Sequence, residues 1–245
     1  MNTVFTIAGK DIREAFRNKT TIIYVAFMLL IAFPYFDGLR STLNNIAPSD
    51  PTTSAESASR TFLSLATTTL PLTLSMLFCT YLSAYAIVLE KARRTLESLL
   101  ATPASLRQVW VGKSLGVALP GVVVTLSVLV VAIVAINFAV IIPRTGSFVL
   151  PAAAPAAVGF VLVPLLTFEI VGLVSLLQMI VSNPRVANFG FVAVFFGLYF
   201  LTVTGTAASW DFRLISLAAL AVLTIVNYLM TRLLTKDRVV LSSKA

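Results

Sequence analysis

Residues 114–142 read SLGVALPGVVVTLSVLVVAIVAINFAVII, a run of 29 residues without a charged side chain. A helix needs about 20 apolar residues to cross a hydrocarbon core of about 30 Å. This run is therefore long enough to cross a bilayer with a tilt or to extend beyond it. It predicts a membrane-spanning helix and sets the class of the whole chain.

The composition of the chain supports the same class. Of its 245 residues, 58% are hydrophobic and 11% are charged, whereas an ordinary soluble domain carries about 25% charged residues. We therefore expect an all-α integral membrane protein. Histidine is absent and Cys79 is the single cysteine, so we expect no metal site and no histidine-activated nucleophile. A hydrolase is disfavoured, and Cys79 is expected to be a packing residue.

The hydropathy pattern predicts six spans. They cover residues 20–36, 63–89, 114–142, 156–181, 189–208 and 214–234. Residues 37–62, which are rich in Ser, Thr, Asn and Pro, are expected to form an external loop with a short helix at most. Residues 1–19 are expected to form an interfacial amphipathic helix. Its apolar stripe would consist of Val4, Phe5, Ala8, Ile12, Ala15 and Phe16.

The distribution of positive charge predicts the topology. Fourteen of the 18 Lys and Arg residues lie near the two termini or in the loops that follow the second and fourth spans. The positive-inside rule places both termini and these loops in the cytoplasm of a cell whose inner or plasma membrane holds the chain. The net charge of +8 is thereby explained without nucleic acid as a partner.

Gly112-Lys113-Ser114 resembles the end of a phosphate-binding loop. That motif needs glycine at position 107 and a strand before the helix, but residue 107 is Arg and the triplet opens a span. We therefore expect no nucleotide site and no enzymatic activity in this chain. Lys113 is interpreted as an interfacial anchor, and Gly112 with Gly116 as a small-residue contact between helices.

The charged region at residues 90–113 has the pattern of two short helices. Leu96, Leu99 and Leu100 share one helical face, and Pro103 ends that helix. Ser105 can cap a second helix that leads into the third span. A plain connector needs only a few residues, so we interpret this region as a docking surface. A membrane-surface helix without a partner is the alternative.

The stretch LEKARRTLESLLATPASLRQVWVGKSL, residues 89–115, resembles the signature of type-2 ABC transporter permeases. VSNPRVANFG, residues 181–190, resembles a second, weaker element of that family at the turn between the fourth and fifth spans. The six-span layout fits as well, with sodium-exporter and drug-exporter permeases the most similar in character.

The resemblance implies a coupling helix that docks on a separate ATPase subunit, where ATP and Mg would bind. It also implies a second permease chain, with a homodimer expected and a heterodimer as the alternative. The residues expected to form or support the coupling region are Glu90, Lys91, Arg93, Arg94, Thr95, Leu96, Glu97, Leu99, Leu100, Thr102 and Pro103. A second cytoplasmic contact is expected at Asn183, Pro184 and Arg185.

Glu169 is the one acidic side chain well inside a predicted span. A charge near mid-bilayer costs about 2.5–3.5 kcal/mol on insertion scales, so it should face protein or water. Two interpretations stay open: a pathway or gating residue that meets a cationic substrate, and a hydrogen bond to another span, for example to Asn137 or Asn227 or to Ser and Thr groups.

The sequence thus predicts the permease subunit of an ATP-binding cassette exporter, which forms the pathway and couples to a separate ATPase. The alternative is a secondary transporter or channel that uses Glu169. Such proteins often contain repeats or paired broken helices, and neither stands out here.

Overall fold

The structure is a computed structural model that describes residues 3–44, 51–92, 103–181 and 211–235, together with residues 193, 196, 197 and 200. These residues are nearly all helical, and no strand occurs among them. The all-α prediction is therefore confirmed for this part of the chain. Three π-helical turns, η1 to η3, interrupt the long helices.

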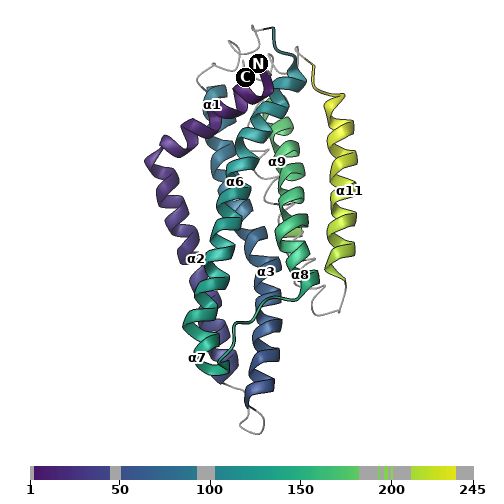
Figure 1. Cartoon of the computed structure of the whole chain (residues 1–245). Helices are drawn as coiled ribbons and strands as arrows, with labels where there is room; N and C mark the ends of the chain where they lie inside the picture. The colour runs from purple at the N-terminus through teal and green to yellow at the C-terminus, as the bar shows by residue number, and fades with distance from the viewer. Residues whose placement is uncertain are drawn as a thin grey trace.

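The elements follow one another along the chain, and Figure 1 shows most of them with their labels. Their bounds are α1 Thr3–Arg17, α2 Lys19–Asn44, α3 Pro51–Ser83, η1 Ala84–Val88, α4 Leu89–Ala92, α6 Leu106–Ile136, η2 Asn137–Ile141, α7 Ile142–Thr145, α8 Ala153–Ala157, η3 Val158–Leu162, α9 Val163–Ile180 and α11 Phe212–Thr231.

Five helical stretches in the described residues are long and apolar enough to cross a membrane. They are Lys19–Ser41, Ala55–Val88, Leu106–Thr145, Ala153–Ile180 and Arg213–Thr231. The chain is therefore a multi-pass membrane protein. The span expected at residues 189–208 lies almost wholly outside the described residues.

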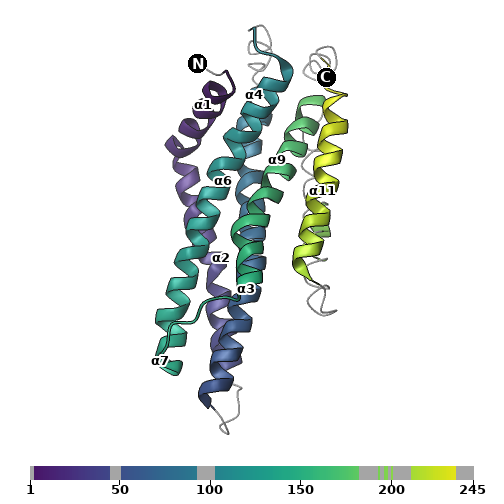
Figure 2. The same cartoon turned by 45° about the vertical axis from the view of Figure 1, so that its right-hand side comes forward.

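Helices α3, α6 and α9 form the centre of the bundle, with α2 and α11 on opposite sides (Figures 1 and 2). Large, fully buried side chains such as Leu74, Phe78 and Leu129 pack between these central helices. Cys79 is buried in the same core, which confirms its expected packing role. Most of α2 and α11 is exposed, as expected for helices that face lipid or another subunit.

The segment at residues 37–62 corrects the sequence prediction. Helix α2 continues through Pro34 to Asn44, and α3 already begins at Pro51. Proline is tolerated inside membrane helices and favoured in a helix's first turn. A hydroxyl of this Ser/Thr-rich segment bonds back to its own helix, since Thr61 Oγ1 donates to the carbonyl of Ser57 at 3.0 Å. A composition typical of loops is therefore compatible with helix here.

Helix α1 lies across the end of α6, and α4 and the C-terminal ends of α9 and α11 lie at this same end of the bundle (Figures 1 and 2). We call it the α1 end. The opposite end, which carries α7, is called the α7 end. This arrangement brings the residues before the predicted coupling helix close to the N-terminal helix.

Candidate functional site

The structure describes only part of the predicted coupling region. Glu90 and Lys91 lie in α4, and Pro103 lies in an exposed bend just before α6. The remaining predicted residues lie outside the described part of the chain: Arg93, Arg94, Thr95, Leu96, Glu97, Leu99, Leu100 and Thr102, as well as Asn183, Pro184 and Arg185. The site can therefore be built from the elements that hold both ends of residues 93–102.

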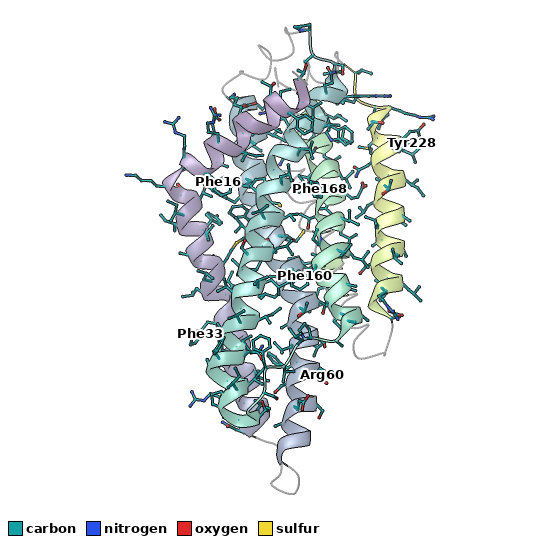
Figure 3. The ribbon with its side chains drawn as sticks, viewed as in Figure 1. Phe16, Phe33, Arg60, Phe160, Phe168 and Tyr228 are labelled. Carbon is teal, nitrogen blue, oxygen red and sulfur yellow. The ribbon has the colours of Figure 1, made fainter. Side chains whose placement is uncertain are left out.

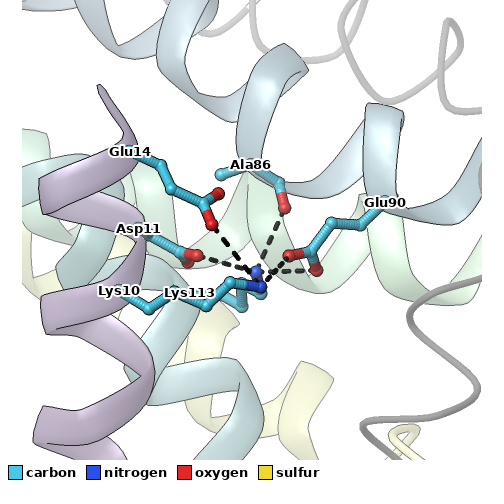
Figure 4. Close-up of polar contacts among 6 residues, drawn as sticks. All are labelled: Lys10, Asp11, Glu14, Ala86, Glu90 and Lys113. Carbon is cyan, nitrogen blue, oxygen red and sulfur yellow. Dashed lines mark hydrogen bonds and ion pairs between the residues drawn. The ribbon is translucent and has the colours of Figure 1, made fainter. Parts of the chain in front are cut away.

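Lys113 is the centre of a buried ion-pair cluster at the α1 end. Its Nζ lies 2.7 Å from Glu90 Oε2 and 3.0 Å from Asp11 Oδ1, and it donates to the Ala86 carbonyl of η1 at 3.2 Å (Figure 4). The side chains of Lys113 and Asp11 are only 2% and 3% exposed. We call Lys10, Asp11, Glu90 and Lys113 the Lys113 cluster, and it joins α1, α4 and α6.

The position of Lys113 corrects its interpretation as an interfacial anchor. The ammonium group is buried inside the protein, where Asp11 and Glu90 compensate its charge. A lysine at the beginning of a span is typical of an anchor, whereas its carboxylate partners lie far away in the sequence. The contacts of Lys113 could therefore not be read from its neighbours along the chain.

Lys10 completes the cluster on its outer side. Its Nζ lies 3.3 Å from Glu90 Oε1 and 3.9 Å from Glu14 Oε1, and its side chain is 59% exposed. Glu90 is thus held by one buried and one exposed lysine. Since exposed pairs contribute about 0–1 kcal/mol, the contact between Glu90 and Lys113 is expected to fix α4.

Two glycines of α6 allow α1 to approach closely. A Cβ atom at Gly112 would lie 2.9 Å from Ile7 Cβ, and one at Gly116 would lie 2.9 Å from Asp11 Cβ. The expected small-residue contact of Gly112 and Gly116 is present, and its partner is α1. The helix predicted near residues 1–19 is present as α1. Its buried residues are Ile7, Ala8, Asp11 and Ala15, while Phe5 and Phe16 of the predicted apolar stripe are exposed.

We expect Gly116→Ala to destabilise the protein by about 1–3 kcal/mol, because the added methyl group would overlap Asp11. Gly9→Ala is the matched control, since nothing lies within 4 Å of its added Cβ and alanine favours helix. Thermal unfolding of the detergent-solubilised variants measures both. A Gly116→Ala variant as stable as Gly9→Ala would show that α1 does not pack on α6 in this way.

Asp11 has a raised pKa. Burial raises its pKa from 3.8 to about 6, against the opposing influence of the Lys113 ammonium. Its Oδ2 is buried and has no hydrogen-bond partner among the described residues. In the unfolded chain the carboxyl regains its ordinary pKa, so the folded state binds more protons between pH 4 and pH 6. The contribution of Asp11 to stability therefore falls as the pH rises through this window.

We expect Asp11→Asn to remove this pH dependence. Relative to the variant, the wild-type protein should lose stability on the order of 1–3 kcal/mol between pH 4.5 and pH 6.5, and the difference should stay constant above that range. Unfolding midpoints of both proteins across this range provide the measurement. A difference that grows in favour of the wild type as the pH rises would mean that the pKa of Asp11 is lowered instead.

Lys91 links the predicted coupling region to the second predicted contact. Its Nζ donates to the carbonyl of Val181 at 2.6 Å and to that of Gln178 at 3.2 Å, at the C-terminal end of α9. Burial lowers the pKa of Lys91, while the carbonyls at a helix C-terminus attract a cation. Gln178 Nε2 also donates to Ser83 Oγ at 3.2 Å. Lys91 therefore joins the end of α4 to the end of α9, and these are the two places where the segments after Ala92 and after Val181 begin.

The far end of residues 93–102 is fixed by the start of α6. Ser105 caps the helix, with its hydroxyl accepting from the Gln108 amide at 3.2 Å and the Gln108 side chain accepting from the Ser105 amide at 2.9 Å. This confirms the predicted cap. Trp110 Nε1 then donates to the Gly172 carbonyl at 2.8 Å, which joins α6 to α9.

Glu169 is held by α11. Its Oε2 accepts from Asn227 Nδ2 at 2.5 Å, and the Thr224 hydroxyl lies 3.0 Å from Oε1. Asn227 also donates to the Glu169 carbonyl at 2.8 Å. Of the two asparagines named from the sequence, Asn227 is therefore the one in contact, and Thr224 is one of the expected Ser and Thr partners. Asn137 instead binds the Val149 amide and the Ile133 carbonyl.

Sequence reasoning missed Asp11 and the role of Lys113. Two signals were available: Asp11 is an acidic residue between Ala8 and Ala15 on an otherwise apolar helix face, and Lys113 lies between two glycines that bring another helix close. Together they indicate a buried pair, because a charge on a packed face needs a partner.

Comparison with known proteins places this architecture in a family. A sequence model of ABC-2 family transporter proteins matches residues 5–209. No curated protein and no solved structure shows a significant match. The matched part includes most of α1, the Lys113 cluster and the segments on both sides of residues 93–102. The chain therefore belongs to the ABC-2 family of transporter proteins, and its role is that of a membrane transport permease.

Proposed function

We propose that the chain is the membrane subunit of an ATP-driven exporter in an inner or plasma membrane. In this proposal six spans form the pathway, and both termini lie in the cytoplasm. A separate ATPase subunit binds ATP and Mg and docks on residues 90–103, with a second contact at residues 183–185. A second permease chain, identical in the simplest case, completes the pathway.

One observation carries the proposal. Glu90 and Lys91, at the start of the predicted coupling helix, are tied to α1, α6 and α9 at once through Asp11, Lys113 and the carbonyls of Gln178 and Val181. A docking helix must pass a displacement on to the spans. Packed helices joined by buried charge pairs can carry such a displacement as a unit, whereas a loose connector cannot.

The proposal is tested by partner association. The tagged chain is purified from its native membranes, and the co-purified proteins are examined for an ATP-binding cassette sequence and for ATP hydrolysis. Leu99→Arg and Leu100→Arg should abolish this association, because they place a charge in the apolar face of a helix bound in a groove. Ser98→Arg, on the opposite face of that helix, is the matched control. Association that survives both leucine variants would refute the coupling assignment.

The competing proposal, a secondary transporter driven through Glu169, is separated by a second variant. The donors Asn227 and Thr224 support a structural role for Glu169. Glu169→Gln should therefore leave ATP-dependent transport within about twofold of wild type, because an amide can still accept a hydrogen bond. Loss of all transport in Glu169→Gln, together with transport by the wild-type chain without any ATPase, would favour the ion-driven alternative.

A further inference from the structure

A cavity of about 380 Å³ opens at the α7 end, between α2 and the η2 and α7 turns that follow α6. Its volume is within the range of small-molecule sites. An apolar wall is formed by Phe33 and Phe36, whose rings stack at 6.2 Å, and a charged rim is formed by Asp37, Arg40 and Arg144. Figure 3 marks Phe33 low on α2.

The charges on this rim do not neutralise one another. Within the described part of the chain, neither the Asp37 carboxylate nor the Arg40 guanidinium forms an ion pair or a hydrogen bond. The Arg144 guanidinium is oriented by Asn44 Oδ1 at 2.6 Å and by the Arg40 carbonyl at 3.5 Å. The rim thus offers two cations and one anion around an open space, and the Arg40 guanidinium keeps its N–H donors available for a ligand.

The depth of the cavity matches the headgroup region of a bilayer. The 21 helical steps from Lys19 to Arg40 span about 32 Å at helical rise, close to the hydrocarbon thickness of about 30 Å. With Lys19 at one interface, Arg40 reaches the other. Phe33, two turns earlier, is 67% exposed and so lies at the height of the acyl chains. The cavity therefore joins lipid tails to the charged interface.

We propose that this cavity binds the headgroup of an aminophospholipid. Arg40 and Arg144 donate to the phosphate oxygens, since guanidinium groups match a phosphate in charge and geometry. Asp37 accepts from the primary ammonium, and Phe33 and Phe36 lie along the beginning of the acyl chains. The single carboxylate on the rim favours this headgroup over a phosphoglycerol headgroup, which offers no cation to Asp37. The site does not depend on the ATPase partner.

The test uses the full-length chain in detergent with equimolar phosphatidylethanolamine, phosphatidylglycerol and diacylglycerol of the same acyl chains. Retained lipid is measured by native mass spectrometry. We expect retention in that order, and about tenfold weaker retention of phosphatidylethanolamine by Arg40→Gln/Arg144→Gln. Asp37→Asn should abolish the preference over phosphatidylglycerol. Arg60→Gln, an exposed arginine of α3 paired with Glu56, is the matched control and should retain lipid as the wild type does.

Several results would overturn the proposal. The first is full retention of phosphatidylethanolamine by the double variant, and the second is a loss in Arg60→Gln as large as the loss in the double variant. The third is a wild-type preference for phosphatidylglycerol or diacylglycerol. The fourth is displacement of the lipid by millimolar inorganic phosphate. A change of oligomeric state in the double variant would assign the rim to a subunit interface instead. Should the double variant fail to fold, Arg40→Gln replaces it, because this guanidinium has no partner within the described residues.

Discussion

The Lys113→Met variant is expected to lose about 3–5 kcal/mol of unfolding free energy, the loss typical of a buried ion pair that is deprived of one partner. Methionine fills the volume but leaves Asp11 and Glu90 facing each other without the cation between them. Protonation of Asp11, whose pKa is already about 6, would relieve part of the repulsion and keep the loss at the lower end near neutral pH. Chemical unfolding in detergent micelles measures the change.

Lys10→Met provides the matched control for this variant. Lys10 also pairs with Glu90, but its side chain is 59% exposed, so the loss should stay below about 1 kcal/mol. Equal losses in the two variants would show that burial of Lys113 does not set the strength of the cluster. A Lys113→Met variant as stable as the wild type would contradict the assigned contacts.

The second large effect is expected at the C-terminal end of α9, in the Lys91→Met variant. The variant removes a cation that binds the carbonyls of Val181 and Gln178. Each charged hydrogen bond contributes about 1.5–3 kcal/mol, so local opening of the helix end should become roughly ten- to a hundredfold more frequent. Hydrogen–deuterium exchange of the amides of Met179, Ile180 and Val181 reports this opening directly.

Two further variants make the result specific. Lys91→Arg keeps the charge and should restore much of the protection, although its planar group fits a site built for an ammonium less well. Lys19→Met removes an exposed lysine and should leave exchange at α9 unchanged. Exchange in Lys91→Met that equals the wild type would mean that Lys91 does not hold the end of α9.

In the proposed function Lys91 also connects the two segments that contact the ATPase. The two segments expected to touch the ATPase are residues 90–103 and 183–185, and Lys91 of the first is bonded to the carbonyls of Gln178 and Val181, just before the second. In this proposal a displacement of one segment would be passed to the other, and to α1 and α6 through Glu90 and Lys113. Buried charges cost stability unless they are paired, and their arrangement at this one point is consistent with a requirement for rigidity.

Much of the local structure could be predicted from the sequence. Apolar runs such as residues 114–142 predict helices because a spanning segment must satisfy its backbone internally. Ser105 with Gln108 predicts a capping box, since both partners are three residues apart. Gly112 and Gly116 predict a close helix contact because they share one face. Each of these signals is contained in a few neighbouring residues.

The remainder depends on contacts between distant residues. Neither the partners of Lys113 nor the carbonyls that bind Lys91 can be recognised from neighbouring residues, because they are brought together only by packing of α1, α4, α6 and α9. Asn227 could be named as a candidate partner of Glu169, but so could Asn137, and only helix packing distinguishes them. The helices at the two ends of residues 37–62 do not follow from a loop-like composition, because hydroxyl side chains such as that of Thr61 can bond to their own helix.

The most direct test of the central claim is position-specific crosslinking from residue 99. Cys79 is the only cysteine and is buried, so a Cys79→Ala background accepts a single photoreactive label at Leu99→Cys. In native membranes the label should capture an ATP-binding cassette subunit, whereas the same label at Ser57→Cys, exposed on α3 toward the α7 end, should not. Capture of that subunit equally from both positions, or from neither while it still co-purifies with the chain, would contradict the assignment of residues 90–103 as its docking surface.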